Sequence, residues 1–315
     1  MKKLVRSRVF PMVALLIVII LVYSILSNGV FIGFKNIRNI LQSTTVVSLL
    51  AIGAGMLMIA GYIDLSLGGI GTMCAMLAAY MLRAGCPWYL ALITALVLGG
   101  IAGAFNAVMV NELNFQSFIA TLATASITQG ITSIISNGKQ IDISNPVFKF
   151  IGNQRIADII PVSVIISLLA LLIYGILLKK TKFGRSVYLI GGSPAASRLA
   201  GLKPKKISYI LFINAGCLAA LAGIILAGRL KSATAVGITN SQFAGLTAAI
   251  LGGISFGGGV GGMGGALVGI LILNCFNNGM TVINVNPYWQ TIASGVLLLV
   301  ALMVDFMSQR RRTKL

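Results

Sequence analysis

The sequence of 315 residues contains no histidine and only five acidic residues, and this scarcity narrows the chemistry that the chain can perform. General acid–base catalysis and metal binding both need several such side chains close together. Each acid stands alone among apolar segments: Asp64, Glu112, Asp142, Asp158 and Asp305. We therefore expect neither an enzyme active site nor a metal site, and no cofactor on this chain.

The four cysteines include no Cys-x-x-Cys pair, a spacing typical of metal and redox sites. Cys74, Cys217 and Cys275 lie in apolar runs, and Cys86 lies in a loop. We interpret them as small, mostly buried side chains without redox function.

Charged residues are also scarce at 9%, whereas 57% of the residues are apolar, which indicates a membrane protein. The formal charge of +19 would suggest nucleic-acid binding if the cations shared one face. Instead, 16 of the 24 lysines and arginines fall in three short segments, 2–8, 179–206 and 310–314. Residues 232–304 carry no charge. We expect membrane lipid around the chain and no nucleic-acid partner.

Apolar runs bounded by charges, glycine or proline predict an all-α, polytopic integral membrane protein with one transmembrane domain over residues 1–315. The run after the basic N-terminus has no Ala-x-Ala cleavage site, so we interpret it as an uncleaved first span. Ten spans are expected, at about 9–28, 41–61, 66–82, 88–110, 115–136, 159–178, 207–228, 241–257, 264–283 and 288–307.

An even number of spans puts both termini on one side of the membrane. Both termini are basic, so the positive-inside rule identifies that side as the cytoplasm. The same count places the loop 179–206, which has eight cations and no acid, on the cytoplasmic side as well. It places 137–158 and 229–240 outside.

Residues 193–201 predict a helix of about two turns within the cytoplasmic loop 179–206. Ser193 is a good N-cap, Pro194 suits the first helical position, and Gly201 suits the position after the C-cap. A helix this short is marginal in water, so we expect it to pack against another surface. That surface is either the chain's own membrane domain or a cytoplasmic partner.

The stretch ILGGISFGGGVGGMGG at 250–265 matches the formula Gly-x-Gly-x-x-Gly twice, but its context excludes a dinucleotide site. Such a fold needs a preceding strand and an acid about 20 residues further on, whereas no charge follows before Asp305. A P-loop is excluded too, because Gly138 and Lys139 are followed by Gln140.

The same stretch predicts two helices with a tight break between them. Glycine recurs at every fourth position from Gly253 to Gly269, a spacing that lets membrane helices approach closely. Seven glycines between 257 and 265 oppose a continuous helix by about 1 kcal/mol each. Discontinuous helices often border a substrate path, and whether 241–283 spans or re-enters the membrane stays open. The glycines assigned to the break and its packing are Gly252, Gly253, Gly257, Gly258, Gly261 and Gly265.

A few polar residues interrupt the apolar runs and are candidates for a substrate path. Asp64 is an acid at membrane depth, which suggests function, but it also lies where an N-cap for the following helix belongs. Threonines on one helical face either bind substrate hydroxyls or join neighbouring helices. The candidates are Asp64, Ser66, Asn106, Thr121, Thr124, Thr128, Gln129, Asn274, Asn277 and Asn278.

The scarcity of acids also bears on the energy source. A proton-coupled carrier normally needs intramembrane carboxylates or histidines, and Asp64 is the only acid near bilayer depth. Sodium coupling is weakened but not excluded, because carbonyl and hydroxyl oxygens alone can bind sodium. Active transport would therefore draw its energy from another subunit.

The motif GYIDLSLGG at 61–69 resembles Gly-Ile-Asp-Leu-Ser-Val-Gly of the permease subunits of ribose-type ABC sugar importers. The likeness continues through TKFGRSVYLIGGSPAASRLAGLKPKKI, AAILGGISFGGGVGGMGGALVGILI and NNGMTVINVNPYWQ, in order, over roughly residues 40–307. The chain departs from the family pattern in three places. No acid stands near Gln242 and Phe243, FQSFI replaces Ile-Pro-Pro-Phe-Ile, and Tyr62 replaces a glycine.

The resemblance implies a permease for a monosaccharide or similar small polar solute in the inner membrane of a prokaryote, working by alternating access as a homodimer or a pair of related chains. It implies two more partners: a cytoplasmic ATPase that holds ATP and Mg, and an extracytoplasmic solute-binding protein. The alternative hypothesis is a self-sufficient secondary transporter or facilitator. The segment that resembles the ATPase-coupling loop contains Phe183, Gly184, Arg185, Gly191, Gly192, Ser193, Pro194, Arg198 and Gly201.

Overall fold

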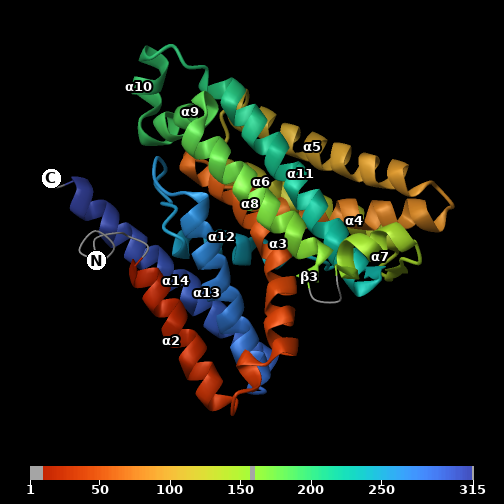
Figure 1. The fold of residues 1–315 in the computed structure, drawn as a ribbon. Coiled ribbons are helices and arrows are strands. Elements are labelled where there is room, and N and C mark those ends of the chain that lie inside the picture. The colour runs from red at the N-terminus through yellow and green to blue at the C-terminus, as the bar shows by residue number, and fades with distance from the viewer. Residues whose placement is uncertain (1–9, 157–159, 314–315) are drawn as a thin grey trace.

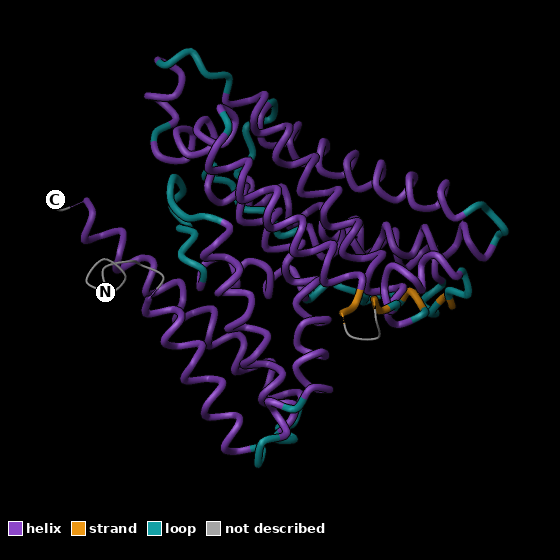
Figure 2. Tube along the Cα trace, viewed as in Figure 1, coloured by secondary structure: helices purple, strands orange, loops and turns teal. Residues whose placement is uncertain are grey.

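The structure, a computed structural model, describes residues 10–156 and 160–313 (Figure 1). The basic segment 2–8, Asp158 and Lys314 lie outside the described residues. The described chain is mostly helical, and its few strands are two residues long (Figure 2). The predicted all-α class is confirmed.

The helices in chain order are α2 (Phe10–Leu26), η1 (Val30–Ile32), α3 (Phe34–Ile59), α4 (Leu67–Arg83), α5 (Trp88–Asn111), α6 (Ser117–Ser136), α7 (Pro146–Asn153), α8 (Val162–Lys180), α9 (Lys182–Gly192), α10 (Pro194–Leu199), α11 (Pro204–Leu230), α12 (Ser241–Leu251), α13 (Met263–Val282) and α14 (Pro287–Thr313). The strands are β1 (Ile141–Asp142), β2 (Arg155–Ile156), β3 (Ile160–Pro161) and β4 (Ser232–Ala233). β1 pairs with β4 and β2 with β3, both antiparallel.

The ten predicted spans correspond to ten apolar helices of the described chain. Seven of these helices are long and apolar enough to cross a membrane, and α2, α4 and α12 are shorter. At about 1.5 Å per residue, the 11 residues of α12 extend roughly 16 Å, about half the hydrocarbon thickness of a bilayer. The predicted discontinuous segment is therefore a half-length helix, which follows the turns of 234–240.

The core forms around α3 and α11, and small residues let their neighbours approach closely. In the most apolar part of α3, 83% of the residues are buried within the chain. Where α5 crosses α11, a Cβ at Gly99 would lie 2.5 Å from the carbonyl oxygen of Gly216. A Cβ at Gly223 of α11 would overlap the carbonyl of Gly71 in α4 in the same way. These helices pack backbone against backbone, as small residues allow in membranes.

The helix α3 lies between two groups of helices (Figure 1). In the first group α11 contacts α4 and α5, and α4 contacts α6. In the second group α13 contacts α2, α12 and α14. The helices α9 and α10, here called the hairpin, form one end of the molecule (Figure 1). The short strands lie together at a distance from the hairpin, beside α7 (Figures 1 and 2).

Candidate functional site

The segment between α3 and α4 turns inside the bundle and buries its acid. Only 3% of Asp64 is exposed. Its Oδ1 accepts hydrogen bonds from the backbone N–H of Ser66 at 2.8 Å and from the Ser66 hydroxyl at 2.5 Å. Ser66, and not Asp64, occupies the N-cap position of α4, so the expected capping role is corrected: Asp64 holds the turn that precedes the helix.

Side chains from α5 and α6 close this turn into a hydrogen-bonded network. The Asn106 amide donates to the Ser66 hydroxyl at 2.8 Å and to Asp64 Oδ2 at 3.4 Å. The Thr124 hydroxyl donates to Asn106 Oδ1 at 2.5 Å, and Thr121 Oγ1 accepts the N–H of Leu65 at 3.1 Å. All of these side chains are buried. The side chains of the network therefore bond to one another and to the turn, which they fix. Of the two alternatives for Thr121 and Thr124, this is the one in which threonines join neighbouring helices.

Thr128 lies on the same buried face of α6 but outside the network. Its hydroxyl donates to the backbone carbonyl of Thr124 at 2.8 Å, within its own helix. A Cβ at Gly69 of α4 would overlap this hydroxyl, so Thr128 marks a close contact between α4 and α6. A contact with substrate stays a prediction for every residue of this face.

Gln129 belongs to a second, half-exposed polar group, in which the turns before α12 bind α4 and α6. Its amide donates to the Ala235 carbonyl at 2.8 Å, and its Oε1 accepts the Thr239 hydroxyl at 3.0 Å. The N–H of Ile238 donates to Thr72 Oγ1 of α4 at 3.0 Å. Nearby, the Oε1 of Gln242 is buried and has no hydrogen-bond partner among the described residues. This group was found only in part from the sequence, through Gln129.

The asparagines of α13 form a third group, which shares no hydrogen bond with the first two in the described structure. The Asn36 amide of α3 donates to Asn278 Oδ1 at 2.8 Å, and the Ser294 hydroxyl of α14 donates to Asn277 Oδ1 at 3.0 Å. Asn274 donates to the Ile270 carbonyl of its own helix at 2.9 Å. These residues join α13 to its neighbours, so the structure does not bring the ten pathway candidates together.

The glycine loop, residues 252–262, separates α12 from α13, which is the break that the sequence predicts. A Cβ at Gly252 would lie 2.5 Å from the carbonyl oxygen of Gly265, so the two helices touch through their backbones at the loop's base. Gly253 and Gly261 have positive φ values of 78° and 129°, and Gly258 has 83°, conformations that other residues rarely adopt.

The hairpin has the caps that the sequence predicts, but it contains an additional helix. Ser193 Oγ accepts the N–H of Ala196 at 3.2 Å, and Pro194 is the first residue of α10. Gly201 follows the C-cap with φ at 74°. The helix α10 is only six residues long, and α9, which precedes it, was not predicted. Leu199 is 92% exposed, so α10 presents its surface away from the bundle.

The other predicted coupling residues lie on α9, and its two ends differ. At its start, Gly184 is buried and donates its N–H to Thr181 Oγ1 at 3.0 Å, while Arg185 is exposed and Phe183 is half-buried. Arg198 is exposed on α10. Thus α9 packs on the chain's own membrane domain, and α10 is free to meet another surface.

The far end of α9 touches the glycine loop. A Cβ at Gly191 would overlap the Ile59 carbonyl oxygen at the end of α3 and would lie 2.6 Å from Gly259 N. The Gly259 N–H itself donates to that carbonyl at 2.8 Å. The Tyr188 hydroxyl donates to the Gly261 carbonyl at 2.8 Å, and burial raises the pKa of Tyr188. A cavity of about 430 Å³ opens beside this contact, lined partly by Lys179 and Arg185.

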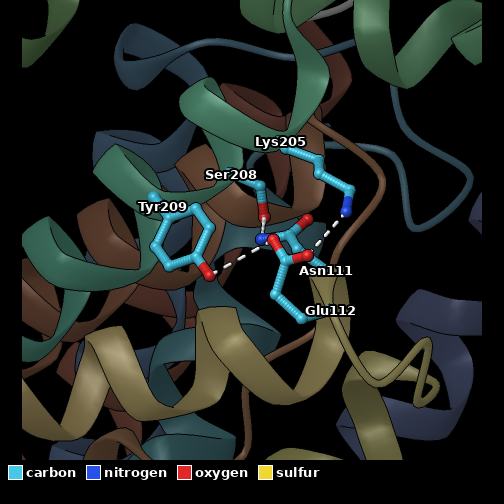
Figure 3. A network of polar contacts seen from close by, with 5 residues as sticks. All are labelled: Asn111, Glu112, Lys205, Ser208 and Tyr209. Atoms are coloured by element: carbon cyan, nitrogen blue, oxygen red, sulfur yellow. Dashed lines mark hydrogen bonds and ion pairs between the residues drawn. The ribbon is translucent and has the colours of Figure 1, made fainter.

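An exposed ion pair joins the start of α11 to the end of α5, and sequence analysis missed it (Figure 3). Lys205 Nζ lies 2.8 Å from Glu112 Oε2 at the end of α5, and the Tyr209 hydroxyl donates to Glu112 Oε1 at 3.5 Å. Beside it, the Asn111 amide donates to the Ser208 hydroxyl at 3.1 Å (Figure 3). The sequence features that could have predicted this pair are the lone acid Glu112 and the cluster of lysines at 203–206.

Comparison with known proteins identifies the family. A family model described as "Branched-chain amino acid transport system / permease component" matches residues 36–302. The chain is 35% identical over 303 residues to the ribose import permease protein of Bacillus subtilis, covering 96% of this chain and 93% of the relative. It is 33% identical over 306 residues to that of Haemophilus influenzae, with the same coverage.

A third relative is the D-allose transport system permease protein of Escherichia coli, which is 32% identical over 293 residues, 92% of this chain and 89% of the relative. No solved structure matches the chain. Since the family model and these relatives cover nearly all of the hairpin, the glycine loop and the ten apolar helices, the chain belongs to this family of transport-system permease components.

Proposed function

We propose that the chain is the membrane subunit of an ABC importer that moves a monosaccharide or a similar small polar solute by alternating access. The relatives named for ribose and D-allose support this solute class. The family is one of permease components, so the nucleotide chemistry, ATP with its Mg, belongs to a separate cytoplasmic ATPase. The membrane is the inner membrane of a prokaryote.

The observation that carries the proposal is the form of the hairpin. It exposes α10 together with Arg198, and the whole segment 179–206 contains eight cations and no acid. Its other helix, α9, packs against the C-terminal end of α3 through Gly191 and against the glycine loop through Gly191 and Tyr188. An element that is exposed at one end and packed against a helix break at the other is suited to transmit motion from a docked ATPase.

The arrangement of helices also supports the proposed orientation. The end of α14 contacts the glycine loop, which contacts α9, so the C-terminal end of the last span lies beside the basic hairpin. By the positive-inside rule we assign this end to the cytoplasm, with both termini. The segments around α7 and β4 then face outward, toward the solute-binding protein.

We place solute contact at the half-exposed group around Gln129, Thr239 and Gln242, and give the buried Asp64 network a supporting role. Gln242 offers a buried Oε1 without a partner among the described residues, and amides and hydroxyls are the groups that bind sugar hydroxyls. A second permease chain, most simply another copy of this one, would complete the path by packing against the face of α6 that this chain leaves exposed.

Reconstitution into liposomes tests the function. The chain is assembled with the ATPase and the binding protein of its own transporter, and uptake of labelled D-ribose and D-allose is measured. We expect uptake only when all three proteins and ATP are present. Gradient-driven uptake of the same sugars by the chain alone would contradict the proposal and support a self-sufficient transporter. If the complete assembly takes up neither sugar but transports a solute that is not a sugar, the solute class alone is corrected.

A further inference from the structure

Asp305 is an acid that the proposed function does not yet use. It lies near the end of α14, and its Oδ2 accepts the backbone N–H of Phe256 in the glycine loop at 2.9 Å. The same oxygen accepts the Ser255 hydroxyl at 3.3 Å and the Gln309 amide at 2.7 Å. The Gln309 amide also donates to Ser255 Oγ at 3.0 Å. We call these four residues the latch.

The latch and the hairpin hold opposite sides of one short loop. From α9 and α3, Gly191, Tyr188 and Ile59 contact residues 258–261 of the loop. From α14, Asp305 and Gln309 contact residues 255–257, and a Cβ at Gly257 would lie 2.7 Å from Gln309 Oε1. Gly258 and Gly259, on the hairpin side of the loop, have positive φ values. The loop is therefore a short bridge from the hairpin to α14.

The apolar part of α14 is loosely embedded, and the latch gives this end of the helix a polar attachment to the glycine loop. Only 6% of the most apolar part of α14 is buried within the chain, and Ala301 is the buried apolar residue of this helix among those described. A charge-assisted hydrogen bond is about twice as strong as a neutral one, and here one carboxylate oxygen accepts three.

We propose that Asp305 is a positioning residue for transport: it fixes the glycine loop to α14, so that a movement of the hairpin shifts α14 together with α12 and α13. The inference rests on the proposed function, since the hairpin moves only if an ATPase drives it. Asp305 touches no solute and acts through the loop backbone. Losing the latch uncouples the hairpin from α14.

The experiment compares Asp305→Ala, Asp305→Asn and wild type in the reconstituted transporter, and measures D-ribose taken up per ATP hydrolysed. We expect this ratio to fall about fivefold or more in Asp305→Ala, the scale of losing charge-assisted hydrogen bonds. Asp305→Asn should be intermediate, because its amide oxygen still accepts the Phe256 N–H. The matched control is Thr291→Ala in the same helix, at an exposed residue whose hydroxyl donates to the Pro287 carbonyl at 3.1 Å, and it should leave the ratio unchanged.

A second readout separates the latch from the proposed function, because it uses the permease alone. The purified permease is transferred to D2O, and deuterium labelling of the loop peptide that contains the Phe256 N–H is followed by mass spectrometry. We expect Asp305→Ala to accelerate this labelling severalfold, since the Phe256 N–H loses its acceptor. Unchanged labelling overturns the latch, whether or not the assembly transports sugar.

Two more results would overturn the inference. One is faster labelling with an unchanged ratio of sugar to ATP, since the loop would then be loosened without consequence for transport. The other is a loss of transport that only matches a loss of folded protein, as measured by thermal unfolding in detergent. If wild type takes up no solute at all with ATP, the proposed function fails, and the labelling result still decides whether the latch exists.

Discussion

The helices α11 and α14 are each 27 residues long, but the chain embeds them very differently. In the most apolar part of each helix, 67% of the residues of α11 are buried within the chain, against 6% for α14. The glycines and alanines of α11 meet the backbones of α4 and α5. The outer face of α14 carries large apolar side chains such as Leu299 and Met303.

The difference indicates which helices form the rigid frame and which are free to move. A membrane offers little hydrophobic driving force between helices, so close packing of small residues decides their association. The α11 group has this packing, whereas α14 presents its apolar face to lipid. We expect alternating access to shift α12, α13 and α14 against the frame.

The largest effect should come from a branched side chain in the frame. In Gly216→Val the new side chain overlaps the Gly99 carbonyl, and neither backbone can withdraw, so we expect a loss of about 3 kcal/mol or more of stability. The control is Gly295→Val in α14, where a Cβ would meet nothing within 4 Å. Thermal unfolding in detergent measures both variants. Equal losses in the two variants would remove the distinction between the helices.

Truncation of leucines should give a smaller effect in the same direction. Leu211 of α11 is fully buried, so Leu211→Ala leaves a cavity and should cost about 2 kcal/mol. Leu299 of α14 is 62% exposed, so lipid replaces its lost contacts and Leu299→Ala should cost less than about 0.5 kcal/mol. The same unfolding assay checks the pair. A loss of stability in Leu299→Ala as large as that in Leu211→Ala would contradict the prediction and would mean that a second chain covers this face of α14.

The helices and the glycine break could be predicted because their signals are local. Long apolar runs separated by charges define the spans, and the capping residues Ser193 and Pro194 define the start of α10. Glycine spacing between 252 and 265 predicts the break, since both the helix preference and the close contact depend on residues near in sequence.

The grouping of the polar residues could not be predicted, because it depends on which helices meet. Asn106 is 40 positions from Ser66 and becomes its partner only when α5 packs beside the turn before α4. Gln309 and Ser255 are 54 positions apart. Residue type and helical spacing made ten polar residues candidates for a path, and the structure distributes nine of them over three groups, with Thr128 beside the first. The lone acids Glu112 and Asp305 were the overlooked signals.

The central claim, that the hairpin drives the glycine loop through Gly191, is tested most directly by two neighbouring glycines. Gly191→Val places a side chain against the Ile59 carbonyl and Gly259, whereas a Cβ at Gly192 would meet nothing within 4 Å. In the reconstituted transporter, D-ribose uptake per ATP hydrolysed is measured for both variants, with ATPase binding as a check of assembly. The account predicts that Gly191→Val loses most uptake while hydrolysis continues, and that Gly192→Val transports like wild type. Normal uptake by Gly191→Val would contradict it.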